Sequence, residues 1–539
     1  MRAVSDPFNI SNHDVEPTQP FNIGSACTAV GADSEARHHR VAVVVDQADG
    51  GSLEMTYAEL NGQSNRFAGV LRDAGLISGD RVLIWLPNRI EFPVVFFGAL
   101  KLGAVAVPAS MLLTATEVQF LQRNSGARAL VTTKDLLSRL QEHDFDFSGL
   151  DAIWLVDESE SDRALNRALQ KQSDRDWDCT TLANDPAYLV YTSGTTGYPK
   201  GVLHAHRALL GRLPAARNWF HYDPENVDRV LHTGKFNWTY VLGTGLMDPL
   251  FLGKTVIVYN GDATPSVWPQ LIARHRASIF IAVPTLYRQI IQKTDFGAKD
   301  VPSLRHCMCA GEHLSGDVLR AWQSRFEQPI YEAIGMSECS YYLSQHPSYP
   351  LKPGSAGRPQ PGHRIALLDQ HMQPVADEEE GMLCIHKQDL GLFLEYWQAP
   401  DEMAEASQGD YFLTGDYARR DRDGDFWFLG RRDDMINTFG YRVSPVEVER
   451  VIKTHPHITD CVALQETVAT DKHILTVCVI TGGDTHSHPH PSESDIIAFA
   501  AEELAAYKVP KRVVFCQQFP RTANGKVLRS ALRDQLALS

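Results

Sequence analysis

Short hydrophobic runs recur along the first 360 residues, and stretches with helical spacing of apolar residues separate them. The runs are rich in β-branched residues, which favours strands over helices. They lie at Val41–Val45, Val82–Leu86, Ala104–Val107, Ala129–Val131, Ile153–Val156, Leu189–Tyr191, Thr255–Val258 and Ile279–Ala282. Because strands alternate with helices, this pattern predicts an α/β fold built on parallel sheets.

A representative predicted helix covers Thr56–Gly75. Thr56 can cap its first turn, and Glu59 stands three residues later, where it can complete a capping box. Apolar residues then follow at helical spacing at Leu60, Phe67, Val70 and Leu71. The sequence therefore predicts a helix with one face turned to the core.

The most hydrophobic stretch is Phe92–Ala109. Lys101 interrupts it, prolines stand at Pro93 and Pro108, and it divides into a helical part, a glycine turn and the β-like run Val105–Val107. A membrane-spanning helix needs about 20 continuous apolar residues. We therefore predict a buried helix followed by a strand.

The pattern changes after about residue 360. Hairpin-like segments appear at Tyr411–Asp416 and Phe426–Leu429, with the turn Asp423–Gly424 between them. This change predicts a β-rich subdomain at the end of the large N-terminal part.

The last hundred residues or so read as a separate α+β domain. The predicted elements are a helix at Ser444–Lys453, strands at Val462–Leu464 and Ile474–Ile480, a helix at Ser492–Ala506 and a strand at Val513–Phe515. We place the border near Asp433, which gives an N-terminal domain of residues 1–432 and a C-terminal domain of residues 433–539.

Length and charge support this picture. The chain has 539 residues, more than the 250–300 or so that one hydrophobic core supports, and 43% of them are hydrophobic and 22% charged. With 51 Lys+Arg against 66 Asp+Glu the net charge is -15. Such a surface repels a polyanion, so we expect no nucleic-acid partner.

The nine cysteines form no C-x-x-C pair, and only Cys307 and Cys309 are closely spaced. This fits neither a zinc site nor a disulfide framework. The first ten residues lack an apolar signal region, and the last five form neither a lipidation box nor a peroxisomal signal. We therefore expect a cytoplasmic protein.

One segment stands out chemically, because it follows an apolar run and combines hydroxyl groups, glycines and a lysine. It contains Thr192, Ser193, Gly194, Thr195, Thr196, Gly197, Lys200 and Gly201. Glycines let the backbone approach an anion, hydroxyls donate hydrogen bonds and the lysine adds charge. The segment thus predicts a phosphate-binding loop. It is not a Walker A loop, because Pro199 and Gly201 stand where that motif needs glycine and a hydroxyl residue.

Two other local matches fail. Gly243–Asp248 lacks the last glycine of a dinucleotide fingerprint, and Gly335–Cys339 ends in cysteine rather than closing a nucleophile elbow. Neither a dehydrogenase nor a serine hydrolase is indicated. Polar clusters instead recur far apart, at Gly311–Glu312, Ile334–Glu338, Thr414–Asp416, Gly430–Asp433 and Pro520–Lys526.

In their order and spacing, these clusters resemble those of the AMP-forming acyl-CoA synthetases of the adenylate-forming superfamily. The resemblance extends from about residue 20 to about residue 535, and its most specific parts are Thr192–Lys200, Thr414–Asp416 with Gly430–Arg431, and Asn524–Lys526. It implies that ATP and a carboxylic acid form an acyl-adenylate and pyrophosphate. Coenzyme A then displaces AMP and becomes the thioester.

The resemblance assigns ATP-binding roles. Thr192–Lys200 would surround the β- and γ-phosphates, Glu332 would lie near the adenine amino group, and Asp416 with Arg431 would hold the ribose. The implied ATP-binding set is Thr192, Ser193, Gly194, Thr195, Thr196, Gly197, Lys200, Gly311, Glu332, Asp416 and Arg431. A carboxylate such as Asp416 suits the ribose because it can accept hydrogen bonds from both hydroxyls.

Catalytic roles follow from the same resemblance. Ser337 would offer its hydroxyl to the α-phosphate, and Glu338 would hold Mg2+, a hard cation that prefers oxygen ligands. Lys526 would neutralise the charge that develops at the α-phosphorus. Asp433 resembles the family's hinge, about which a small mobile C-terminal domain would bring Lys526 in and move it out.

The implied acyl pocket includes Phe236, Asn237, Trp238, Tyr240 and Ala310. Its aromatic bulk favours a compact wall over a long apolar tunnel. The absence of an extra Arg or Lys in this run, which could bind a second carboxylate, favours a monocarboxylate. The pair Ile334–Gly335 resembles the benzoate-CoA ligase branch, which favours aryl acids, while medium-chain aliphatic acids stay open. Core packing is an equal alternative for Trp238 and Tyr240.

Two other functions stay open. The chain could load an acyl group onto the pantetheine of a carrier protein, although no carrier domain is fused to it. It could instead be a nucleotide-binding protein without catalysis, against which the presence of Lys526, Asp416 and Glu338 argues. A homodimer is left open as well.

Overall fold

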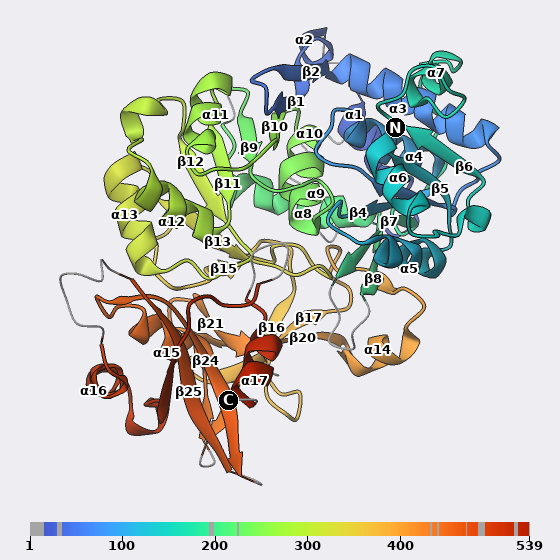
Figure 1. Cartoon of the computed structure of the whole chain (residues 1–539). Helices are drawn as coiled ribbons and strands as arrows, with labels where there is room; N and C mark the ends of the chain where they lie inside the picture. The colour runs from blue at the N-terminus through green and yellow to red at the C-terminus, as the bar shows by residue number, and fades with distance from the viewer. Residues whose placement is uncertain are drawn as a thin grey trace. The chain divides into compact units, whose positions relative to one another are not determined.

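The computed structural model describes residues 16–29, 35–192, 199–223, 226–431, 434–438, 441–469, 472–482, 491–521 and 527–537 (Figure 1). The chain divides into two compact units. The first contains residues 1–364 and 386–410, and the second contains residues 365–385 and 411–539. The β-rich region thus groups largely with the C-terminal residues, and a domain border at Asp433 stays a prediction.

A seven-stranded sheet forms one part of the first unit. Its order is β18 (Glu395–Tyr396), β8 (Lys200–Ala205), β7 (Pro186–Thr192), β4 (Val105–Ala109), β3 (Arg81–Trp85), β5 (Ala127–Thr132) and β6 (Ala152–Leu155). The strands from β7 to β6 are parallel, whereas β8 and β18 add antiparallel strands at one edge. The predicted parallel sheet is therefore confirmed.

A nine-stranded sheet forms the other part. Its order is β15 (Arg358–Pro359), β14 (Leu343–Ser344), β13 (Ile330–Ile334), β12 (His306–Cys309), β11 (Ile279–Ala282), β9 (Arg229–His232), β10 (Thr255–Asn260), β1 (Val41–Gln47) and β2 (Ser52–Thr56). The six strands from β13 to β1 are parallel. All eight hydrophobic runs predicted as strands overlap strands of these two sheets.

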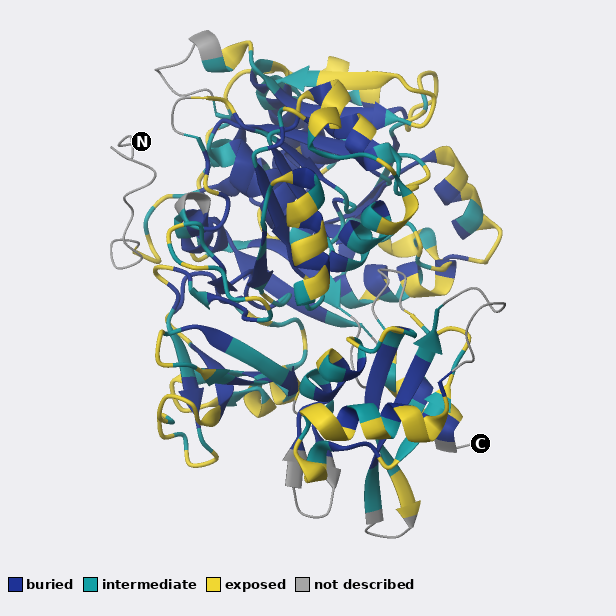
Figure 2. Cartoon of the chain, turned by 90° about the vertical axis from the view of Figure 1, so that its left-hand side faces the viewer, coloured by how far each residue is buried: buried dark blue, intermediate teal, exposed yellow. Residues whose placement is uncertain are grey.

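Helices pack against both sheets. They are α1 (Ile23–Thr28), α2 (Glu35–His38), α3 (Tyr57–Asp73), α4 (Glu91–Leu102), α5 (Ala115–Ser125), α6 (Lys134–Gln141), α7 (Leu165–Gln170), α8 (Arg207–Arg217), α9 (Thr239–Leu242), α10 (Asp248–Phe251), α11 (Val267–His275), α12 (Pro284–Lys293), α13 (Gly316–Phe326) and α14 (Pro400–Glu405). Figure 2 shows buried strands inside this unit and exposed residues on the outer faces of its helices.

Two local predictions are confirmed at α3 and α4. Thr56 caps α3, and its backbone N–H donates to Glu59 Oε2 at 2.8 Å, which completes the capping box. Helix α4 ends at Gly103, whose φ of 84° requires glycine, and β4 follows. In the part of the chain that the structure describes, no helix is long and apolar enough to cross a membrane.

The second unit begins with β16 (Ile365–Leu368), β17 (Glu380–His386), β20 (Tyr411–Arg420) and β21 (Phe426–Arg431), which form a five-stranded sheet together with β19 (Ser407–Gln408). In this sheet β16 pairs with β17, and β20 with β21, in antiparallel register. The predicted hairpin is formed by β20 and β21, with Gly424 at φ 90° in its turn. Its other elements are β22 (Ile436–Thr438), β23 (Tyr441–Val443), α15 (Pro445–Ile452), β24 (Ile458–Ala469), β25 (Lys472–Thr481), α16 (Glu493–Glu503), β26 (Arg512–Phe515) and α17 (Arg529–Ala537).

Candidate active site

The predicted phosphate loop connects two paired strands. Thr192 at the end of β7 lies opposite Lys200 at the start of β8 in the antiparallel register, so the connection starts and ends at one point of the sheet. Ser193, Gly194, Thr195, Thr196 and Gly197 lie outside the described residues, and their phosphate contacts stay a prediction. The structure therefore places only the two ends of the loop.

Lys200 has neighbours that the sequence did not indicate. Its Nζ lies 2.5 Å from Oε2 of Glu402, in the first turn of α14, and 5.7 Å from the centre of the Tyr396 ring. The side chain of Lys200 is 24% exposed. A phosphate that binds Lys200 must share this cation with Glu402 or displace the carboxylate.

The segment Ile334–Glu338 leaves β13 in a tight turn. A Cβ on Gly335 would lie 2.1 Å from the backbone nitrogen of Tyr341, so only glycine fits there. The Met336 N–H donates to the carbonyl of Cys339 at 2.9 Å and closes the turn. The turn places Ser337 and Glu338 side by side directly after the sheet.

A histidine that the sequence did not single out holds this turn from β8. His204 Nε2 donates to the Ser337 carbonyl at 2.7 Å, and the His204 ring stacks on Tyr188 with centroids 4.7 Å apart. Burial lowers the pKa of His204 to about 3, so the ring is neutral near pH 7. The Ser337 backbone is thereby tied to the strand that begins at Lys200.

Glu338 is held by a second unpredicted residue. The Tyr396 hydroxyl, on β18, donates to Glu338 Oε1 at 2.7 Å, and Glu338 is 8% exposed. Because Tyr396 also lies beside Lys200, it connects the end of the phosphate loop with the carboxylate predicted to hold Mg2+. Carboxylate oxygen is the ligand type that Mg2+ prefers, so the residue fits that role chemically.

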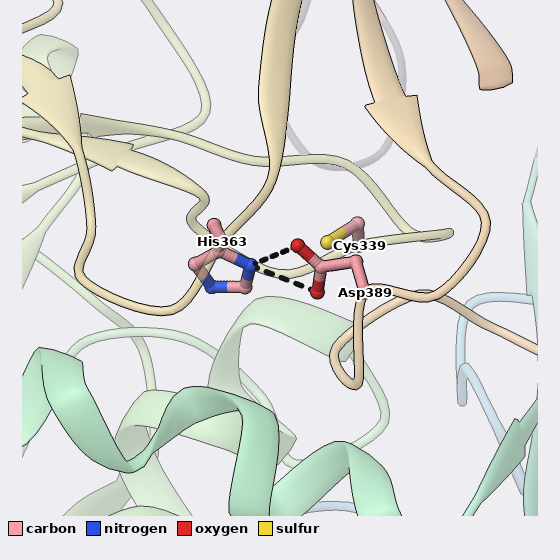
Figure 3. A group of neighbouring side chains, drawn as sticks. All are labelled: Cys339, His363 and Asp389. Atoms are coloured by element: carbon pink, nitrogen blue, oxygen red, sulfur yellow. Dashed lines mark hydrogen bonds and ion pairs between the residues drawn. The ribbon is translucent and has the colours of Figure 1, made fainter. Parts of the chain in front are cut away.

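Cys339, the residue after Glu338, forms a buried cluster with His363 and Asp389. The potential ligand atoms of these three residues lie within 4.8 Å of one another (Figure 3). His363 Nδ1 lies 3.0 Å from one Asp389 oxygen and 3.1 Å from the other. The same carboxylate accepts hydrogen bonds from the N–H groups of Arg364 and Gly391, both at 2.8 Å.

Burial alone would raise the pKa of Asp389, but His363 and the two backbone donors outweigh burial and lower it. Because its oxygens are occupied in this way, we interpret the cluster as an anchor for the chain around Glu338 rather than as a metal site. Cys339 also pairs with Leu392 in an antiparallel bridge, which brings the segment before β18 to the same place.

The predicted adenine side is built by Glu332 and Gly311. Glu332 on β13 is 3% exposed, and its Oε1 accepts a hydrogen bond from the Leu314 N–H at 3.2 Å. Its Oε2 has no hydrogen-bond partner among the described residues, which leaves an acceptor for an amino group. Gly311 has φ +90°, and a Cβ there would lie 3.4 Å from Trp238.

The predicted acyl residues separate into two groups. Trp238 and Tyr240 lie together with ring centroids 5.2 Å apart, and Ala310 belongs to the hydrophobic cluster against which Tyr240 packs. Asn237 beside them is half-buried. Phe236 instead stacks on Phe92 of α4 at 5.1 Å and is 1% exposed, which is a core position. Trp238, Tyr240 and Ala310 are therefore the residues that the structure brings close to Gly311.

In the second unit, the structure brings Asp416 and Arg431 together. They face each other across β20 and β21, and Arg431 Nε donates to Asp416 Oδ1 at 3.0 Å. Arg431 is half-exposed, whereas Asp416 is 6% exposed. Thr414 supports the pair, because its Oγ1 accepts a hydrogen bond from the Asp416 N–H at 3.1 Å. The predicted ribose pair is thus a preformed charged unit.

Two predicted residues cannot be placed. Lys526 and Asp433 lie outside the described residues, so the catalytic lysine and the hinge stay predictions.

Comparison with known families decides the identity. The model of the AMP-binding enzyme matches residues 32–397, more than half of the chain, and the model of the AMP-binding enzyme C-terminal domain matches residues 447–526. The chain belongs to the AMP-binding enzyme family. All the predicted site residues of the first unit lie within the larger match.

Relatives of this AMP-binding enzyme cover nearly its whole length. It is 28% identical over 508 residues to the uncharacterized acyl-CoA ligase YtcI of Bacillus subtilis (strain 168), covering 93% of this chain and 94% of the relative. It is 29% identical to the 3-hydroxybenzoate-CoA ligase of Aromatoleum sp. (strain CIB), covering 90% and 92%. The crystal structure of the anthranilate CoA ligase AuaEII with anthranoyl-AMP matches with TM-score 0.86 at 28% identity, covering 98% and 99%.

Proposed function

We propose that this enzyme joins an aryl monocarboxylic acid to coenzyme A. The class of AMP-forming acyl-CoA ligase is confirmed by the two family matches and by relatives that span the whole chain. For the aryl acid, the observation that carries the proposal is the contact of Trp238 and Tyr240 beside Gly311. These rings favour a flat aromatic acyl group over a long aliphatic chain.

In the first half-reaction, a carboxylate oxygen of the acid attacks the α-phosphorus of ATP, and pyrophosphate leaves. The proposed roles are that Lys200 and the phosphate loop bind the departing phosphates, Ser337 contacts the α-phosphate, and Asp416 with Arg431 holds the ribose. In the second half-reaction, the thiol of coenzyme A attacks the acyl carbon and AMP leaves. No protein nucleophile is needed, so the protein acts by orientation, charge and exclusion of water.

The proposal has three further parts. The enzyme uses Mg2+, forms a homodimer and works in the cytoplasm. Glu338, held by Tyr396, would bind Mg2+, which would neutralise phosphate charge when bound. All nine cysteines are unpaired, which supports a reducing compartment. Light scattering of the purified protein tests the dimer.

We expect the purified protein to release AMP and pyrophosphate, rather than ADP and phosphate, when it receives ATP, Mg2+, coenzyme A and benzoate or hexanoate. The phosphate loop and the turn at Ser337 direct attack to the α-phosphorus, which makes pyrophosphate the leaving group. Chromatography of the nucleotides and a coupled pyrophosphate assay measure the products.

The same assay separates the alternatives. ADP as the main product would exclude the adenylate mechanism. Pyrophosphate release without a CoA thioester would favour transfer to a carrier protein, and no exchange with any acid would indicate a protein that only binds nucleotide. Turnover of hexanoate or palmitate without turnover of benzoate would contradict the proposal of an aryl acid.

Asp416→Asn is expected to raise the KM for ATP by about 10- to 100-fold, because hydrogen bonds to a charged group contribute about 1.5–3 kcal/mol. The amide also loses the ion pair with Arg431. Initial rates with ATP and with 2′-deoxy-ATP measure the effect, since the variant should distinguish the two nucleotides less than the parent enzyme does. Asp423→Asn, in the exposed turn of the same hairpin, is the matched control. An unchanged KM for Asp416→Asn would refute the ribose role.

A further inference from the structure

Two buried polar atoms without partners lie in the aromatic cluster around Trp238. His232 is the last residue of β9 and is 1% exposed. Its ring meets the Tyr240 ring edge to face, with centroids 4.9 Å apart. Among the described residues, neither His232 Nε2 nor the Tyr240 hydroxyl has a hydrogen-bond partner.

The backbone determines which nitrogen of His232 carries the proton. The Gly234 N–H donates to His232 Nδ1 at 3.0 Å, so Nδ1 is an acceptor and has no proton of its own. Burial lowers the pKa of His232 to about 3, and the ring is neutral near pH 7. The single ring proton is therefore on Nε2, which is a buried donor with nothing to receive its hydrogen bond.

The Tyr240 hydroxyl complements this donor. Burial raises the pKa of Tyr240, so the phenol keeps its proton and can donate one hydrogen bond and accept another. Buried polar groups in native proteins are nearly always satisfied, and an unsatisfied one calls for an explanation such as a bound ligand. Here a donor and a donor–acceptor occur on neighbouring rings.

The position of the two rings links them to the acyl group. Tyr240 packs on Trp238, and the Trp238 ring lies against Gly311, where the chain leaves the nine-stranded sheet. His232 meets the same Tyr240 ring. The polar pair therefore belongs to the aromatic cluster that lies against Gly311, beside the predicted acyl pocket.

Two glycines, Gly234 and Gly245, leave space for the His232 imidazole because they have no side chain. A Cβ on Gly245 would lie 3.0 Å from both Cβ and Cδ2 of His232, and a Cβ on Gly234 would lie 3.4 Å from Nδ1. Gly245 belongs to the π-helical turn Gly243–Met247. Such turns inside α-helical segments frequently mark functional sites.

We propose that His232 and Tyr240 bind a hydroxyl substituent on the ring of the aryl acid, so that the substrate is a hydroxybenzoate. The ring hydroxyl accepts a hydrogen bond from His232 Nε2 and donates a hydrogen bond to the Tyr240 oxygen. This inference rests on the proposed function and names its substrate class. An aromatic amine fits less well, because its lone pair is delocalised into the ring and it would leave the His232 donor unsatisfied.

The first test compares substrates with the parent enzyme. The kcat/KM of CoA thioester formation is measured for benzoate, the three monohydroxybenzoates, the three aminobenzoates and hexanoate. A site built to hydrogen-bond a substrate hydroxyl discriminates strongly against the analogue without it. We expect one hydroxybenzoate to exceed benzoate by about 100-fold and to exceed the aminobenzoate substituted at the same position.

The second test uses Tyr240→Phe and His232→Leu, which remove the two polar atoms and keep apolar bulk. Each should lower the ratio of kcat/KM for the hydroxybenzoate to that for benzoate by about 10-fold or more, mainly through KM. Tyr222→Phe is the matched control, because its hydroxyl is also buried without a partner among the described residues and belongs to the same hydrophobic cluster. Tyr222→Phe should keep the parent enzyme's ratio of kcat/KM for the hydroxybenzoate to that for benzoate.

Calorimetric titration with the preferred hydroxybenzoate gives a readout independent of turnover, and thermal unfolding shows which variants are folded. If His232→Leu does not fold, Tyr240→Phe alone decides.

The outcomes separate the two levels of the proposal. A parent enzyme that prefers benzoate or hexanoate, while releasing AMP, overturns the hydroxyl site and leaves the acyl-CoA ligase in place. Unchanged ratios in both folded variants also overturn the site. Failure to release AMP with every acid overturns the proposed function together with the inference. Loss of the preference in both variants, but not in Tyr222→Phe, supports the site.

Discussion

Lys526→Ala is expected to slow acyl-adenylate formation by about 10²–10³-fold or more, while thioester formation from a supplied acyl-adenylate survives. Removing one preorganised donor from a developing negative charge costs about that factor, and Lys526 would supply a full cation. Coenzyme A attacks an acyl carbon and develops no new charge at the α-phosphorus. The second half-reaction therefore does not need this lysine.

Two assays measure the half-reactions separately. Pyrophosphate exchange reports acyl-adenylate formation, and product formation from synthetic acyl-adenylate reports the thioester step. Lys511→Ala is the matched control, because Lys511 is an exposed lysine of the same unit and the backbone hydrogen bond from its N–H to Leu475 does not involve the side chain. If folded Lys526→Ala loses both half-reactions equally, the lysine is not specific to acyl-adenylate formation. If the variant keeps full pyrophosphate exchange, Lys526 is not the catalytic cation.

The hydrophobic pattern predicted the hairpin that carries Asp416 and Arg431, whereas the roles of these two residues came from the resemblance. Asp416 and Arg431 follow apolar runs separated by a turn signal, and a hairpin necessarily brings such positions face to face. Thr192 and Lys200 likewise end up opposite each other because the two strands that flank the loop pair. In both cases secondary structure alone provides the proximity.

The residues that sequence reasoning missed act over long separations. His204 reaches the Ser337 carbonyl across 133 residues, and Tyr396 reaches Glu338 across 58. A single histidine or tyrosine inside an apolar strand has the same local pattern whether it fills the core or holds a catalytic turn. The strand order, with β18 beside β8 at the sheet edge, is needed to tell a core residue from one that holds the catalytic turn.

Packing against a distant element also explains two features that the local sequence does not indicate. Phe236, whose place in the acyl pocket stays a prediction, stacks on Phe92 of α4, a contact that no residue near it in the sequence indicates. The predicted helix Ser492–Ala506 ends at Glu503, where Leu504 adopts an extended conformation despite the helix-forming alanines around it. Leu504 packs against the core of the second unit, so tertiary packing outweighs propensity there.

Glu338→Gln is expected to lower kcat/KM for adenylation by about 10²–10³-fold, and Tyr396→Phe by about 10-fold. The amide keeps the shape of Glu338 but removes the charge proposed to hold Mg2+. Tyr396→Phe leaves that charge and removes the hydrogen bond of 2.7 Å that orients it. Partners of a metal ligand typically contribute about 10- to 100-fold in metal affinity.

Titration of pyrophosphate exchange with Mg2+ at fixed ATP distinguishes orientation from a general structural effect. Tyr396→Phe should recover most of its rate at high Mg2+, because its defect is weaker binding of the ion, whereas Glu338→Gln should stay slow at every concentration. Glu395→Gln, the exposed carboxylate next to Tyr396, should behave like the parent enzyme. If Tyr396→Phe loses rate without any change in Mg2+ dependence, the hydrogen bond to Glu338 does not act through binding of the ion, because the variant keeps the ring beside Lys200.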